Sequence, residues 1–115
     1  TSTMAQRAYA PTAAPTRSER SIEYDVIARI TSRLKSAIED GDRVKLIHSL
    51  HENRELWRVL AIEVSGSDNL LPDDLRARIF YLAEFTTHHS RRVMREKVSA
   101  IPLLEVNTAI LRGLK

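Results

Sequence analysis

Four segments of the chain repeat apolar residues at spacings of three and four, and this pattern limits the fold more than any other feature. In the first segment, residues 18–40, the apolar stripe follows a period of 3.6 residues and predicts an amphipathic helix. We expect Ser18 or Ser21 to cap its start and Gly41 to end it in a left-handed conformation. The stripe consists of Ile22, Val26, Ile27, Ile30, Leu34, Ala37 and Ile38.

The second and third segments continue the helical pattern. We expect the second helix to follow the N-cap residue Asp42 and to run to Val64, before the polar break at 65–69. A third helix is expected from Pro72 to Val98, with acidic residues near the positive end of its dipole. The side predicted to be buried carries Leu75, Ile79, Leu82, Ala83, Thr86, Val93 and Val98.

A short fourth helix is expected from Pro102, with Gly113 as its end. The connections are short, so neighbouring helices should pack antiparallel. The sequence thus predicts an all-α, single-domain bundle of about four helices over residues 18–115. Residues 1–17 are rich in Ala, Thr and Pro and predict a flexible N-terminal arm, in which Tyr9 is the single aromatic residue. We interpret residues 1–3, ahead of Met4, as a remnant of cloning.

Composition excludes several classes of protein. The chain has no cysteine, which excludes disulfides, thiolate nucleophiles and Cys-ligated zinc. It has no apolar run near the ~20 residues that span a bilayer, and no stretch typical of a signal peptide. We therefore expect neither a secreted enzyme nor a membrane protein, and no membrane partner. The lack of disulfides permits a reducing cytosol.

The polar residues do not form a recognisable catalytic or metal-binding pattern. His48 and His51 share one helix face and Glu84 and His88 share another, but each helix offers two ligands where a metal needs three or four. No serine lies in a nucleophile elbow, and no pair of carboxylates is placed for acid–base chemistry. We expect no enzyme activity, no metal and no cofactor.

A basic cluster lies at residues 88–97, where four Lys or Arg residues accompany one acid. Such a patch attracts phosphates, but no aromatic residue is interleaved to stack on bases. We favour a solvated helix end that complements the helix dipole, with a nucleic-acid contact as the alternative. The cations are Arg91, Arg92, Arg95 and Lys97.

The most unusual run is Asn53-Arg54-Glu55-Leu56-Trp57, which interrupts the apolar stripe of the second helix. Asn53 and Trp57 are four residues apart and share a face. Trp57, the only tryptophan, is interpreted as a core anchor, whereas Asn53 and Arg54 form either a polar clamp between helices or part of a groove for a partner helix. Asn107 is likewise a polar residue within an apolar stripe, and a contact with Asn53 across the bundle is left open.

Together with residues 53–57, three further motifs resemble the FlaF family, flagellar regulators of alphaproteobacteria. The resemblance covers nearly the whole chain, in order and spacing, and Ala8-Tyr9 fits the family's N-terminal pattern. The other motifs are Asp68-Asn69-Leu70-Leu71-Pro72, Leu75-Arg76-Ala77-Arg78-Ile79 and the segment 104–114.

The resemblance implies a small helical cytoplasmic protein that promotes flagellin synthesis and filament assembly. Proteins of this family are understood to bind flagellin as secretion chaperones and to act with a companion regulator, FlbT. The expected mode is an apolar groove that covers an amphipathic flagellin helix. The alternatives are post-transcriptional control through FlbT or through direct contact of the basic cluster with flagellin mRNA. The candidate partner-binding residues are Tyr9, Asn53, Arg54, Trp57 and Asn107.

Overall fold

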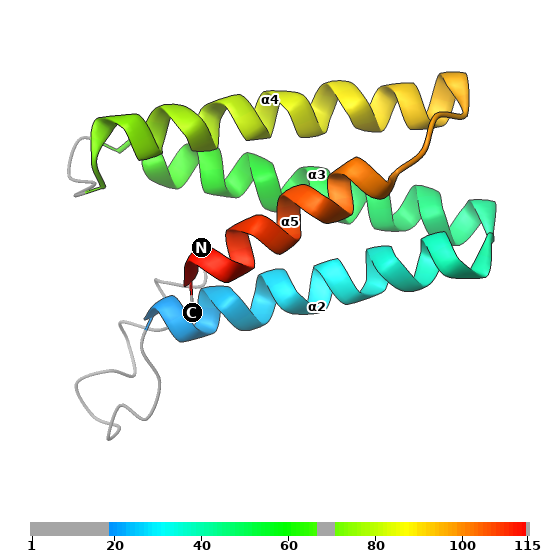
Figure 1. Cartoon of the computed structure of the whole chain (residues 1–115), viewed down its shortest axis with the longest axis horizontal. Coiled ribbons are helices and arrows are strands. Elements are labelled where there is room, and N and C mark those ends of the chain that lie inside the picture. The colour runs from blue at the N-terminus through cyan, green and yellow to red at the C-terminus, as the bar shows by residue number, and fades with distance from the viewer. Residues whose placement is uncertain (1–18, 67–70, 115) are drawn as a thin grey trace.

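The computed structural model describes residues 19–66 and 71–114, without the side chains of Glu19, Arg20, Ile22 and Leu114. Over these residues the chain forms four α-helices and no strand, which confirms the predicted all-α bundle (Figure 1). The helices are α2 (Glu19–Asp40), α3 (Arg43–Val64), α4 (Asp73–Glu96) and α5 (Ile101–Leu114). The capping role of Ser18, the arm with Tyr9 and most of the polar break lie outside the described residues. None of the described helices combines the length and the apolar character needed to cross a membrane.

The turn between α2 and α3 follows the predicted capping chemistry. Gly41 has a φ of +67°, the left-handed conformation expected of the residue that ends α2. The Asp42 carboxylate accepts hydrogen bonds from the backbone N–H groups of Val44 and Lys45, at 3.0 and 3.2 Å. These bonds satisfy two of the amide donors that a helix start leaves without a partner.

Two helix ends differ from the predicted positions by one or two residues. α4 ends at Glu96 rather than at Val98, because Lys97 takes a left-handed conformation with a φ of 56°. Gly113 does not end α5, which continues to Leu114. α5 begins at Ile101, one residue before Pro102, and the Ser99 hydroxyl accepts a hydrogen bond from the Ile101 N–H at 3.1 Å.

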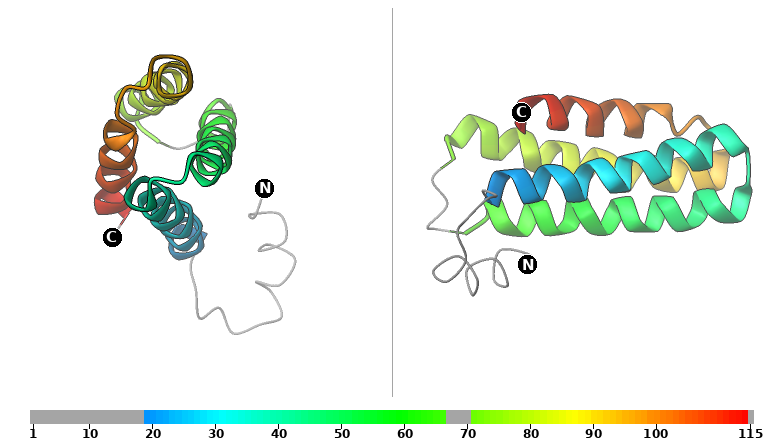
Figure 2. Two further views of the ribbon diagram at one scale, coloured as in Figure 1. Left: turned by 90° about the vertical axis from the view of Figure 1, so that its right-hand side faces the viewer. Right: turned by 90° about the horizontal axis from the view of Figure 1, so that it is seen from below.

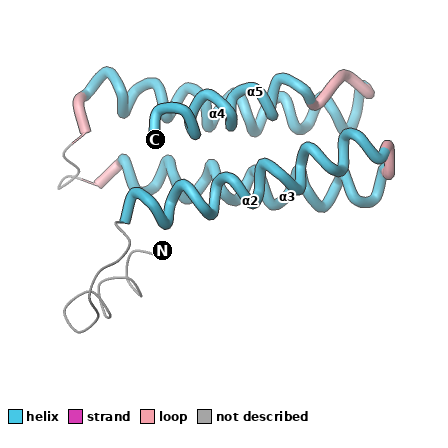
Figure 3. The backbone as a smooth tube through the Cα atoms, turned by 60° about the horizontal axis from the view of Figure 1, so that its bottom comes forward, coloured by secondary structure: helices cyan, strands magenta, loops and turns pink. Residues whose placement is uncertain are grey.

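The helices are arranged so that α3 packs against α2 and α4, while α5 packs against α2 and, less extensively, against α4 (Figure 2). Consecutive helices run antiparallel, as predicted from the short connections (Figure 1). The loops between α2 and α3 and between α4 and α5 lie at one end of the bundle, and the α3–α4 connection lies at the other (Figure 3).

The main core lies toward the end with the α2–α3 and α4–α5 loops. It consists of Leu34, Leu50, Val93, Ala100 and Leu103. The opposite end is less well covered, because α5 has 14 residues and α4 has 24, which correspond to about 21 and 36 Å of helix. Leu75, predicted to be buried, is therefore 39% exposed in the first turn of α4.

Candidate functional site

A network of hydrogen bonds joins three helices inside the bundle. At its centre is Asn107 of α5, whose amide N–H₂ donates to Asn53 Oδ1 at 2.7 Å and to Thr31 Oγ1 at 3.1 Å. The Asn107 carbonyl oxygen accepts from Trp57 Nε1 at 2.9 Å. The Thr31 hydroxyl donates in turn to the Ile27 carbonyl at 2.7 Å. The network thus ties α2, α3 and α5 together by side chains alone.

The network places three of the predicted partner-binding residues in the interior. Asn53 and Asn107 have no exposed surface, and Trp57 is 1% exposed. The contact between Asn53 and Asn107, which the sequence left open, is present as a polar clamp between helices. In this conformation the three side chains do not reach the surface, so their role in contact with a partner stays a prediction.

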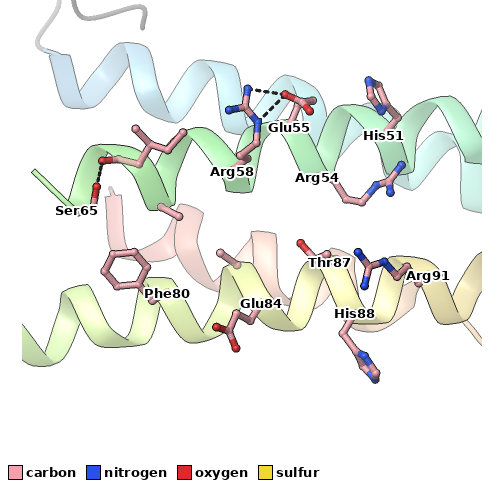
Figure 4. Close-up of a pocket in the computed structure, with 13 residues that line it drawn as sticks. His51, Arg54, Glu55, Arg58, Ser65, Phe80, Glu84, Thr87, His88 and Arg91 are labelled. Atoms are coloured by element: carbon pink, nitrogen blue, oxygen red, sulfur yellow. Dashed lines mark hydrogen bonds and ion pairs between the residues drawn. The ribbon is translucent and has the colours of Figure 1, made fainter.

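Arg54, the fourth of these residues, lines a groove between α3 and α4 (Figure 4). Its side chain is half-buried, and its Nε atom is sealed from solvent without a hydrogen-bond partner among the described residues. The groove continues along both helices for several turns and is lined by His51, Arg54, Glu55, Arg58, Ala61, Ile62, Ser65, Phe80, Ala83, Glu84, Thr87, His88 and Arg91.

The two ends of this groove differ in chemistry. Toward the α3–α4 connection its walls are mostly apolar, and Ile62 and Phe80 are 55% and 39% exposed. Toward the other end it carries the guanidinium groups of Arg54 and Arg91 together with two histidines. An open groove with an apolar end and a cationic end can hold an amphipathic segment of another protein.

The central part of the groove carries an ion pair within α3. Arg58 donates to Glu55 Oε2 from Nε and Nη2, at 3.0 and 2.8 Å. These hydrogen bonds, with the charge of Arg58, lower the pKa of the Glu55 carboxyl below its ordinary value. Arg58 is therefore already paired, whereas Arg54, one turn earlier, is not paired with any described carboxylate.

Every buried side-chain atom that lacks a hydrogen-bond partner within the described ranges belongs to a residue of α3 or α4. These atoms are Asn53 Nδ2, Arg54 Nε, Thr86 Oγ1 and Ser90 Oγ. Buried polar atoms without a partner are costly. Among the described residues, α3 and α4 thus carry the least satisfied polar side chains of the interior, and one of these, Arg54, lines the groove.

A comparison with family models gives one match, to the family described as flagellar protein FlaF, over residues 5–114. The chain belongs to the FlaF family. No curated protein and no solved structure gives a significant match to the chain. Membership confirms the resemblance and establishes that the FlaF protein described here is related to the flagellum.

The four cations of the predicted basic cluster lie in different surroundings in this FlaF chain. Arg91 lines the groove, and Arg92 pairs with Glu96 of its own helix at 3.4 Å. Arg95 and Lys97 are exposed at the end of α4.

A histidine of the same segment belongs to the interior. His89 is 7% exposed, stacks on Phe85 and lies with Nε2 2.7 Å from the Ser99 carbonyl oxygen. That carbonyl can only accept, so Nε2 carries the proton. His89 thus fastens α4 to the loop that leads into α5.

The groove of this FlaF protein includes residues that the sequence analysis did not select. Ile62 and Phe80 lie away from the core-facing stripes of their helices. Apolar residues outside such a stripe are the sequence signal that points to an exposed apolar groove. The paired histidines His48/His51 and the pair Glu84/His88 stay separate, and no group of three or more metal-ligating side chains occurs among the residues that the structure describes.

Proposed function

We propose that this FlaF protein is a cytoplasmic chaperone and regulator that binds flagellin and covers one of its amphipathic helices in the groove between α3 and α4. The observation that carries the proposal is the open apolar end of the groove in a protein of a flagellar family. Through this contact the protein promotes flagellin synthesis and filament assembly.

The physical argument starts from the partner. An amphipathic helix that packs only in the assembled filament exposes its apolar face while it is in the cytosol, where it favours premature association. Ile62 of α3 and Phe80 of α4 flank a groove into which such a face fits, the common mode by which a helix binds another helical protein. Burial of this apolar surface is the driving force of the proposed complex.

The proposal is tested by titrating the protein with purified monomeric flagellin in a calorimeter. We expect saturable one-to-one binding by the wild-type protein, and at least about tenfold weaker binding by the double variant Ile62→Ala/Phe80→Ala, which loses two apolar contacts. Tyr81→Ala is the matched control, because Tyr81 is adjacent to Phe80, is 68% exposed and does not line the groove.

Each result has a separate meaning. Unchanged affinity in the double variant would show that flagellin binds elsewhere on the protein. Absence of any binding by the wild-type protein would contradict the chaperone function itself. Flagellins truncated at either terminus would then identify the helix that is bound.

A further inference from the structure

Resting on the proposed function, we infer that the groove recognises a carboxylate as well as an apolar helix face. The carboxylate is bound by Arg54 and Arg91, at the cationic end of the groove. Figure 4 shows these two side chains on facing walls, one from α3 and one from α4, whereas Glu84 and His88 point away from the space between the helices.

The state of Arg54 is the first argument. Its Nε atom is buried without an acceptor, and an unpaired donor on a charged group has a high desolvation cost. A guanidinium presents several donors in one plane, and a carboxylate matches two of them at once. Arg58 differs, because its Nε and Nη2 atoms already donate to the carboxylate of Glu55 and its charge is neutralised there. A partner's carboxylate can reach this guanidinium only where it faces the groove, and there it would pair with a cation that no described carboxylate neutralises.

The rest of the groove favours a protein carboxylate over a nucleic-acid phosphate. The carboxylate of Glu55 neutralises Arg58, the third arginine of the lining, so this part of the groove offers a continuous phosphate backbone little net positive charge. Beyond Arg58 the lining becomes apolar, with Ile62 and Phe80, and its described residues offer no further cation along the path that a strand would follow. The pattern suits a helix that carries acid at one end and apolar residues along one face.

The same pattern sets the direction of the bound helix. The C-terminal end of a helix carries the negative end of its dipole, and a terminal carboxylate adds to it. We therefore place that end at Arg54 and Arg91 and the N-terminal end toward Phe80. The bound helix would then run parallel to α4 and antiparallel to α3.

The experiment compares flagellin binding at about 0.05 and about 0.5 M NaCl, since salt weakens exposed charge contacts far more than apolar ones. We expect Arg54→Gln/Arg91→Gln to bind about tenfold more weakly than wild type at low salt and to approach it at high salt. Arg78→Gln/Arg95→Gln is the matched control, because it removes the same charge from exposed positions of α4 outside the groove. Arg91→Gln alone replaces an exposed side chain and keeps the test valid if the Arg54 variant unfolds.

The source of the carboxylate is identified with peptides of the flagellin C-terminal helix, as free acid, as amide, and with Asp and Glu replaced by Asn and Gln. If the peptide amide binds more weakly than the free acid, the terminal carboxylate is the group that the arginines bind. If the peptide with Asn and Gln binds more weakly than the unchanged peptide, the group is a side-chain carboxylate. Affinity that is insensitive to both changes would overturn the inference.

Failure of this inference can be distinguished from failure of the proposed function. Equal affinity of wild type and Arg54→Gln/Arg91→Gln at both salt concentrations overturns the carboxylate site, while the effect of Ile62→Ala/Phe80→Ala still tests the apolar groove. Poly-L-glutamate tests the arginines without flagellin: binding that the double variant loses supports the site, and no binding to wild type overturns it. Tighter binding of single-stranded RNA, lost in the same variant, would overturn it in favour of a phosphate site.

Discussion

Trp57 donates its indole N–H to the side-chain carbonyl of Asn107 at 2.9 Å, and this bond crosses the bundle from α3 to α5. The backbones of these two helices do not approach each other as closely as those of neighbouring helices. The polar network therefore supplies a link between helices that are not close neighbours. The side-chain N–H₂ of Asn107 donates to Asn53 of α3 and to Thr31, and the second bond extends this link to α2.

Replacing Asn107 with alanine should destabilise the fold more than the loss of a small side chain would by itself. Asn107→Ala leaves the Trp57 N–H and the Asn53 carbonyl oxygen buried without partners. We expect the free energy of unfolding to fall by about 2–4 kcal/mol, because each unsatisfied buried group costs about 1–3 kcal/mol. Denaturant titration followed by circular dichroism measures this value. Glu105→Ala, at an exposed position of the same helix, should change it by less than about 0.5 kcal/mol, and a similarly small effect of Asn107→Ala would contradict the role of the network.

The fluorescence of Trp57 should report an interior side chain. It is the only tryptophan and is 1% exposed, so iodide should quench its emission only after unfolding. Quenching is measured on the native protein and in a concentrated denaturant, with the unfolded chain as the control. Strong iodide quenching of the native protein would show that Trp57 is accessible, as a surface contact residue would be.

The interior polar residues illustrate what can be predicted from sequence. Asn53 and Asn107 are identifiable because each interrupts an apolar stripe, and a buried amide must find partners. Their mutual contact cannot be derived in the same way, since it depends on the rotation and offset of α3 against α5. Those quantities follow from packing of the whole bundle, not from the period of either helix.

Like the interior network, the groove depends partly on local sequence signals and partly on how the helices pack. The periodicity predicts α3 and α4 well, since their caps and apolar stripes are local signals. Leu75 was predicted to be buried because its position continues the stripe, but burial there requires a covering helix, and α5 is too short to provide it. Arg54 was selected for its neighbours in sequence, whereas its position opposite Arg91 follows from the pairing of α3 with α4.

The pair of Glu55 and Arg58 leads to a prediction on pH. Hydrogen bonds from Arg58 lower the pKa of the Glu55 carboxyl in the folded protein. A carboxyl whose pKa is lower in the folded than in the unfolded state stabilises the fold above its unfolded pKa, and this contribution is lost as the pH falls through the folded pKa. Titration of the side-chain carboxyl carbon by NMR should show the lowered pKa in the wild type and a rise toward the ordinary value in Arg58→Gln. Arg78→Gln should leave the Glu55 titration unchanged, and a wild-type pKa at or above the ordinary value would contradict the pairing.

Two glycines that were both predicted to end helices should respond to alanine in opposite ways. Gly41 has a φ of +67°, and nothing lies within 4 Å of an added Cβ, so the cost of Gly41→Ala comes from the backbone alone. We expect it to lower the free energy of unfolding by about 1–2 kcal/mol. Gly113 lies inside α5, also with open space at its Cβ position, and alanine is the better helix former by up to about 1 kcal/mol. Gly113→Ala should therefore stabilise the protein, by less than this value because the site is near the helix end. Denaturant unfolding of the two variants side by side measures both effects, and destabilisation by Gly113→Ala as large as that by Gly41→Ala would show that Gly113 is a helix end after all.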